Sequence, residues 1–97
     1  MNAKVVTAQF RPGKMDEAIG VYRDSLTLAL QQQKGFKGAL FLTDHNTSKS
    51  ISVILWETEA DMTAGESNAY VRQQFAKFED IVGETSAGQA FEVSVQA

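Results

Sequence analysis

The stretch ISVILWETEADM (residues 51–62) joins a predicted strand to a predicted helix start and decides the fold. A strand with one face in water should alternate between apolar and polar side chains. This strand does not alternate in that way. By strand geometry its two faces carry Ile51, Val53 and Leu55 on one side, and Ser52, Ile54 and Trp56 on the other. Both faces are therefore predicted to be covered.

Periodicity in the rest of the chain predicts the order β-α-β-β-α-β. Strands are expected at residues 4–10, 36–44, 49–58 and 90–96, and the polar HNTS (residues 45–48) indicates a hairpin between the second and third. Helices are expected at residues 14–33 and from Glu59 to about Val82, the second interrupted near Gly65 and Ser67. This order is typical of the ferredoxin-like α+β fold, in which two helices pack on one face of a four-stranded antiparallel sheet.

The helices can cover only one face of that sheet, yet the other strands also carry apolar residues on both faces. These are Val6, Ala8 and Phe10 against Val5 in the first strand, and Phe36, Leu40 and Leu42 against Ala39 and Phe41 in the second. A monomer rarely exposes a contiguous apolar patch of this kind. The simplest cover is a second copy of the chain, so we expect a homodimer whose sheets pack face to face.

Composition indicates one globular domain spanning residues 1–97, with 43% hydrophobic and 22% charged residues. The net charge is -3 and the basic residues are scattered, which argues against nucleic acid and anionic membranes as partners. The chain has no cysteine, no apolar run of membrane-spanning length and no signal-peptide pattern at MNAKVVTAQF. We therefore expect a cytoplasmic protein.

Three segments carry a resemblance to a known family: RPGKMDEAI (residues 11–19), GFKGALFLTD (residues 35–44) and LWETEADM (residues 55–62). Together they are similar to the antibiotic biosynthesis monooxygenase (ABM) family of dimeric α+β barrels. The resemblance covers nearly the whole chain and rests on residues that mark the fold. It implies a barrel formed by the sheets of two subunits. It also implies a cofactor-independent monooxygenase, or a related enzyme, acting on a small aromatic or quinol-like molecule.

The family's functional residues match this sequence only in part. Members that oxidise polycyclic phenols without a cofactor use a strand-three Trp with an Asn four residues earlier and a Tyr six residues later. Here these positions are Trp56, Ser52 and Met62. Haem-degrading members place a Trp and a His where this chain has Gly65 and Phe75. The chain also has only one histidine and no cysteine. We therefore expect no haem, no metal and no other cofactor.

The candidate substrate-binding residues follow from Trp56. We expect Trp56 to border a cavity between sheet and helices, with Ser52 and Ile54 on the same strand face. The other candidates are Met62, Tyr22, Tyr70, Arg72 and Phe75. No residue is assigned a catalytic role. His45 lies beside Asp44 at a predicted hairpin tip, where turn geometry explains both, and no serine has a histidine placed to activate it.

Two functions from different classes remain open. One is the cofactor-independent monooxygenase. The other is a non-catalytic homodimer of the same fold that binds a small aromatic or apolar ligand. Oxygen consumption with hydroquinones and naphthols separates them, because only the enzyme turns the ligand over.

Overall fold

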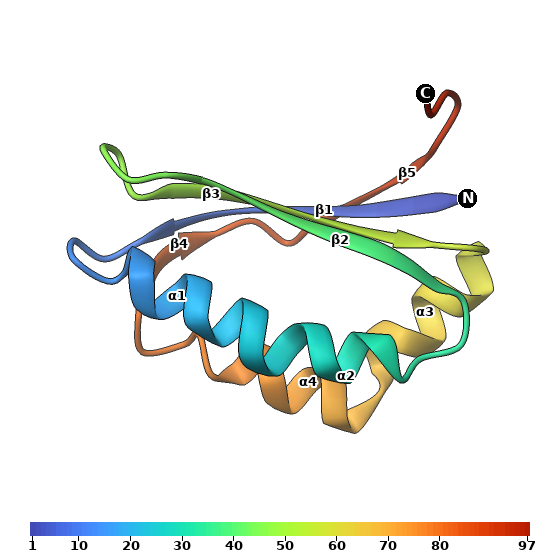
Figure 1. The fold of residues 1–97 in the computed structure, drawn as a ribbon, viewed down its shortest axis with the longest axis horizontal. Helices are drawn as coiled ribbons and strands as arrows, with labels where there is room; N and C mark the ends of the chain where they lie inside the picture. Colours follow the sequence, from blue (N-terminus) through green and yellow to red (C-terminus); the bar gives the residue numbers. More distant parts are fainter.

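Strands β1 (Asn2–Phe10) and β3 (Lys49–Trp56) form the middle of one antiparallel sheet in the computed structural model, which describes residues 1–97. β2 (Phe36–Asp44) pairs with β3, and β4 (Val82–Thr85) pairs with the other edge of β1. The strand order is β2-β3-β1-β4, and the helices all lie on one face (Figure 1). The predicted ferredoxin-like α+β architecture is confirmed.

The last strand differs from the single strand expected at residues 90–96. Two short segments share that edge of β1: β4 pairs with Ala8–Phe10, and β5 (Gln89–Glu92) pairs with Asn2–Val5. Gly88, with φ +86°, lies in the turn between them. The alternation of apolar residues after Ala90 does not extend the strand far, because β5 ends opposite Asn2, the first residue of β1, and beyond that pair only the Val93 N–H donates, to the Met1 carbonyl at 2.9 Å. The sheet therefore has five strands instead of four.

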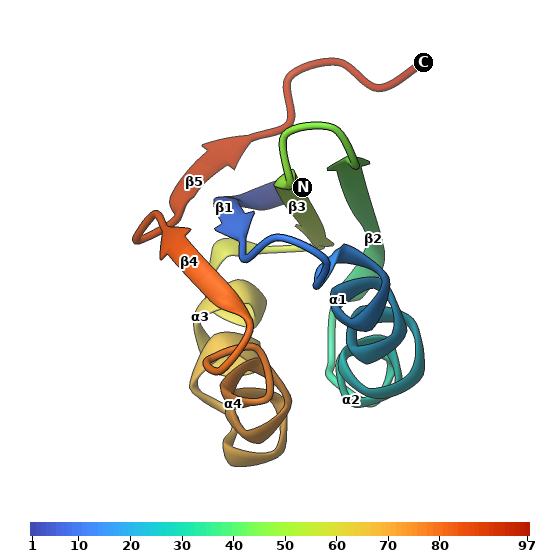
Figure 2. The same cartoon turned by 90° about the vertical axis from the view of Figure 1, so that its left-hand side faces the viewer.

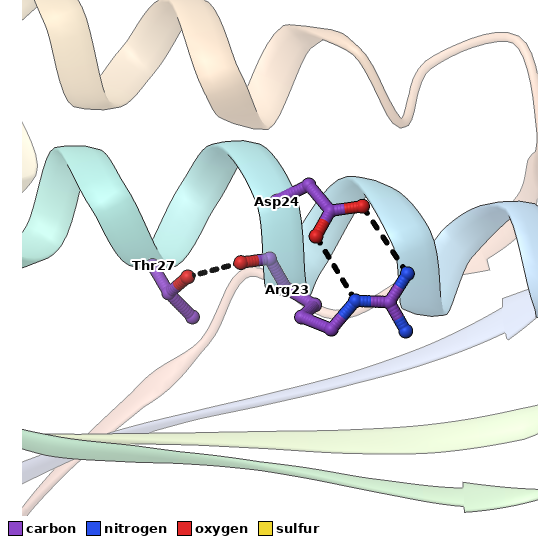
Figure 3. A network of polar contacts seen from close by, with 3 residues as sticks. All are labelled: Arg23, Asp24 and Thr27. Atoms are coloured by element: carbon purple, nitrogen blue, oxygen red, sulfur yellow. Dashed lines mark hydrogen bonds and ion pairs between the residues drawn. The ribbon is translucent and has the colours of Figure 1, made fainter.

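The first helix is continuous but contains a π-helical segment that the periodicity did not predict. α1 (Met15–Val21) passes into η1 (Tyr22–Leu26) and then into α2 (Thr27–Gln31). In η1 the backbone N–H of Thr27 donates to the carbonyl of Tyr22, five residues earlier. The hydroxyl of Thr27 donates to the Arg23 carbonyl, while the Arg23 side chain pairs with Asp24 at the surface (Figure 3). Such π segments frequently occur at functional sites.

The second helix begins where predicted and ends earlier. The side chain of Thr58 caps α3 (Glu59–Ser67), accepting a hydrogen bond from the Asp61 N–H at 3.0 Å. The expected interruption falls at Asn68, whose extended backbone breaks the helix and whose side chain caps α4 (Ala69–Ala76). The prediction that the helix reaches Val82 is wrong. Val82 is apolar at helical spacing but pairs with Phe10 as the start of β4.

The core lies between the sheet and the two helical segments, which run side by side beneath it (Figure 2). One buried cluster gathers around Trp56 and Leu26, and a second around Phe10 and Met15. The opposite face of the sheet carries exposed apolar side chains. These are Leu40, Leu42, Ile51 and Phe91. None of the helices combines the length and the apolar character needed to span a membrane.

Phe36 lies on the opposite face from the one expected. A bulge between Phe36 and Gly38 shifts the register, so that Phe36 pairs with Trp56. The two rings pack edge to face with centroids 6.0 Å apart. Phe36 therefore belongs to the helix-covered core, and only Leu40 and Leu42 of that predicted set face outward.

Candidate functional site

A cavity of about 240 Å³ lies between the inner face of the sheet and the helices. Its walls come from every layer of the fold, and eight of the twelve lining residues are hydrophobic. They are Val6, Ala8, Phe10, Tyr22, Phe41, Ser50, Ser52, Phe75, Phe78, Glu79, Val82 and Thr85. An engineered apolar cavity of roughly 150 Å³ holds benzene, so this one suits a ligand of one or two rings.

The aromatic walls pack against one another and fix the shape of the cavity. Tyr22 stacks on Phe41 with ring centroids 4.4 Å apart and planes 8° from parallel. Phe10 meets Phe41 edge-on at 6.2 Å, and Phe78 lies 6.0 Å from Phe10 and 6.5 Å from Tyr22. These offset and edge-on arrangements are the favourable ones for aromatic pairs. The walls are therefore apolar and held in place by mutual contact.

Two buried hydroxyl groups, from Tyr22 and Ser52, provide the polar part of the cavity floor. The Tyr22 Oη and Ser52 Oγ atoms are 2.8 Å apart, and the residues are only 5% and 8% exposed. One of the two hydroxyl protons makes the bond between them. The other has no acceptor within the protein, so it is available to a ligand oxygen in the cavity.

Burial raises the pKa of Tyr22 above its ordinary value of 10.0, and the hydrogen bond with Ser52 offsets part of that rise. Burial acts in this direction because an apolar environment penalises the charged phenolate. Tyr22 therefore keeps its hydroxyl proton at neutral pH. The π-helical segment places this side chain, since Tyr22 is the first residue of η1.

The remaining polar groups of the cavity differ in whether they already have partners. Ser50 donates its hydroxyl to the Ala8 carbonyl at 3.2 Å, so its proton is used. Glu79 and Thr85 are exposed and form the rim. The hydroxyl of Thr85 donates to backbone carbonyls, whereas the carboxylate of Glu79 makes no hydrogen bond or ion pair within the chain.

Three of the residues predicted from the sequence line this cavity, namely Tyr22, Ser52 and Phe75. Ile54, Trp56 and Met62 belong instead to the neighbouring core cluster, and Tyr70 and Arg72 lie exposed on α4. Trp56 is not among the residues that line this cavity. That these five residues contact a ligand stays a prediction, and their positions outside the cavity do not support it.

Trp56 packs as a core residue for an identifiable reason. It is 1% exposed, and the backbone of α3 at Gly65 closes over its six-membered ring. Phe36 covers another side of the indole. The Trp56 N–H is buried without a hydrogen-bond partner, which adds a cost that the packing has to offset.

Sequence reasoning did not identify the other lining residues as parts of a site, notably Phe10, Phe41, Phe78 and Glu79. One signal for them is present in the sequence. Ser50 and Ser52 occupy inward positions of a central strand, where large apolar side chains are usual, and their small volume leaves room. The aromatic residues opposite that gap become recognisable once the strand register is known.

No three His, Asp or Glu side chains come together in a geometry that would hold a metal ion. The single histidine, His45, lies at the hairpin tip with its Nε2 atom 3.2 Å from Asp16 Oδ1. This contact joins the hairpin to the start of α1, at the surface of the protein.

No protein-family model and no curated protein matches the chain, whereas solved structures match it over nearly its whole length. A candidate antibiotic biosynthesis monooxygenase from Nitrosomonas europaea has a TM-score of 0.81 at 14% identity, covering 98% of this chain and 100% of that one. SnoaB, a cofactor-independent oxygenase from Streptomyces nogalater, has a TM-score of 0.79 at 9% identity, covering 98% and 94%. A conserved protein from Methanosarcina mazei has a TM-score of 0.77 at 16% identity, covering 94% and 91%. At these identities the likeness shows the fold, which is that of the ABM proteins, as the sequence resemblance predicted.

Proposed function

We propose that the protein is a cofactor-independent monooxygenase that takes a small phenol into the aromatic cavity. The observation that carries this proposal is the buried Tyr22–Ser52 hydroxyl pair, with one proton to spare, on the floor of an otherwise apolar cavity. Apolar walls with a few placed polar groups are the usual form of a small-molecule site. The shared fold with SnoaB, which is described as a cofactor-independent oxygenase, supports the same reaction class.

The phenol oxygen sits at the hydroxyl pair, and its ring lies among Phe10, Phe41 and Phe78. No base is buried at the floor, so the phenol gives its proton to solvent water. The spare hydroxyl donates to the substrate oxygen and stabilises the negative charge that develops there. Because the raised pKa keeps Tyr22 protonated, this donor is present across the neutral pH range. The aromatic walls exclude water from the ring carbon that reacts.

Dioxygen is the only co-reactant that this reaction needs. The electron-rich phenolate reduces dioxygen, and a new carbon–oxygen bond forms at a ring carbon that carries hydrogen: the carbon opposite the hydroxyl in 1-naphthol, or the carbon beside it where the opposite carbon is substituted. One oxygen atom stays on that carbon as a carbonyl. The other leaves as water, taking the two hydrogens lost from the O–H and C–H bonds. For 1-naphthol the product is 1,4-naphthoquinone, and the atoms balance.

We also propose that the functional unit is a homodimer formed through the exposed apolar face of the sheet. That face carries Leu40, Leu42 and Ile51. It lies on the side of the sheet away from the helices (Figure 1). A stable interface of this kind would bury on the order of 2,000 Å². The cavity lies on the opposite, helix-covered side, so pairing leaves it within each subunit.

Oxygen consumption with 1-naphthol tests the proposed activity. We expect stoichiometric oxygen uptake with 1,4-naphthoquinone as product. The double variant Tyr22→Phe/Ser52→Ala should lose about 10²-fold in rate, because neither donor remains for the oxyanion. Ser50→Ala is the matched control, since it removes a hydroxyl of the same cavity that is already engaged.

The alternative function is a non-catalytic protein that binds the same kind of ligand in the same cavity. It is favoured by the absence of a buried general base, since the only lining carboxylate is Glu79 at the exposed rim. Binding of 1-naphthol without oxygen uptake would replace the first proposal with this one. Absence of both binding and uptake would contradict both.

A further inference from the structure

Glu79 is the only charged residue that lines the cavity, and the proposed function leaves its side chain without a role. It lies in the turn between α4 and β4, directly after the lining residue Phe78. Its carboxylate has no hydrogen bond and no ion pair within the chain. A negative charge at the mouth of an apolar cavity, with no partner of its own, is available to a charged group on a ligand.

The polar groups available to a ligand therefore lie at two depths in the cavity, the buried floor and the exposed rim. The buried Tyr22–Ser52 pair provides a hydrogen-bond donor at the floor, and the exposed Glu79 provides an acceptor with full negative charge at the rim. The aromatic walls lie between them and present ring faces that attract cations. A ligand that satisfies the groups at both depths has an oxygen at its inner end and a positive charge at its outer end.

Two cationic residues need to be considered beside Glu79. Lys77, in the same turn, donates to Ser25 Oγ at 3.3 Å and does not line the cavity. Arg11 donates from its side chain to the carbonyl of Val82, at 3.5 Å, and its backbone N–H donates to the carbonyl of Ile81. The guanidinium forms no ion pair with Glu79 and does not line the cavity. Glu79 therefore remains the only charged residue that lines the cavity.

We propose that Glu79 makes the cavity selective for phenols that carry an ammonium group on a short side chain, and against phenols that carry a carboxylate. This inference rests on the proposed function, because it assumes that the phenol oxygen binds at the floor. It adds the chemical class of the substrate. The phenol ring enters first, and the ammonium group stays at the rim beside the Glu79 carboxylate.

Three phenols of similar size test the proposal by calorimetry at neutral pH and low salt: tyramine, 4-ethylphenol and 3-(4-hydroxyphenyl)propionate. We expect tyramine to bind most tightly and the carboxylate most weakly, with roughly a tenfold ratio between these two, since unit charges about 4 Å apart interact appreciably even in water. Glu79→Gln should bring the two affinities to within about twofold of each other, because the Coulomb interaction is lost.

Glu84→Gln is the control, because it changes the net charge equally at an exposed β4 residue that does not line the cavity. It should leave the tenfold ratio unchanged. Equal affinity of the wild-type protein for tyramine and the propionate, with 4-ethylphenol still bound, would overturn this inference alone. A tenfold affinity ratio between tyramine and the propionate that persists in Glu79→Gln would also overturn it. If 4-ethylphenol does not bind, the proposed function fails as well.

Discussion

The α-carbon of Gly65 in α3 lies directly against the six-membered ring of Trp56, leaving no room for a side chain between them. A β-carbon at position 65 would overlap ring atoms of the indole. Trp56 cannot move aside easily, because it is fully buried among core residues. This contact holds α3 against the end of β3 and explains why the indole is a core residue.

Gly65→Ala should therefore destabilise the protein by about 1–3 kcal/mol, the usual cost of overpacking a core. Gly20→Ala in α1 is the matched control, because its nearest neighbour is the flexible end of Arg23 at 3.9 Å. That substitution should stabilise by about 0.5–1 kcal/mol, since alanine is the better helix former. Urea unfolding measures both. Equal stability of the two variants would show that the Gly65–Trp56 contact is not tight.

The proposed homodimer makes a prediction about mass. Light scattering behind a sizing column should give twice the chain mass of 10.6 kDa at micromolar concentration. Leu40→Glu should shift the protein towards the monomer, because it places a charge in the proposed interface. Leu28→Glu is the control: Leu28 is 52% exposed against 55% for Leu40, but lies on α2. A wild-type monomer, or equal effects of the two substitutions, would contradict the proposed interface.

Tyr22 should make stability depend on pH in the alkaline range. Because its folded-state pKa lies above the ordinary value of 10.0, the folded protein holds this proton more tightly than the unfolded chain. The resulting stabilisation is complete below about pH 10 and is lost as the pH rises through the folded-state pKa. The difference in unfolding free energy between wild type and Tyr22→Phe should therefore be constant from pH 7 to 9 and change to the disadvantage of wild type above pH 10. A constant difference up to pH 11 would show that burial does not perturb this phenol.

The sequence predicted the architecture well because the fold depends on patterns that span many residues. The two faces predicted for β3 appear as alternating buried and less buried positions, and the residues spaced three and four apart from Met15 to Leu30 form the buried side of the first helix. Local departures from regularity were not predictable in the same way. The bulge beside Gly38 moved Phe36 to the other face, and the π segment at Tyr22 leaves no mark in the hydrophobic pattern.

The site was predicted less well than the fold, for a physical reason. A large buried Trp signals importance in a sequence, but burial and cavity lining are different properties, and Trp56 has only the first. The cavity arises from a deficit of volume at Ser50 and Ser52, opposite aromatic residues from four other segments. Which residues surround such a gap depends on strand register and helix position, and neither is encoded locally.

Either hydroxyl of the Tyr22–Ser52 pair can donate to a ligand, so the experiment has to remove both. Tyr22→Phe or Ser52→Ala alone leaves one hydroxyl with a proton to donate, so each single variant should retain most of the affinity for a phenol. The double variant removes both partners of the buried hydrogen bond, a change that is often close to neutral for stability. It therefore removes the polar floor and leaves the apolar walls in place.

Calorimetric binding of 1-naphthol and naphthalene without oxygen, to wild type and to Tyr22→Phe/Ser52→Ala, tests the central claim most directly. We predict that wild type binds 1-naphthol roughly three- to tenfold more tightly than naphthalene, the ratio expected for one net hydrogen bond. The double variant should bind both compounds with the affinity that wild type has for naphthalene. A wild-type protein that binds neither compound, or a 1-naphthol preference that persists in the double variant, would contradict the account.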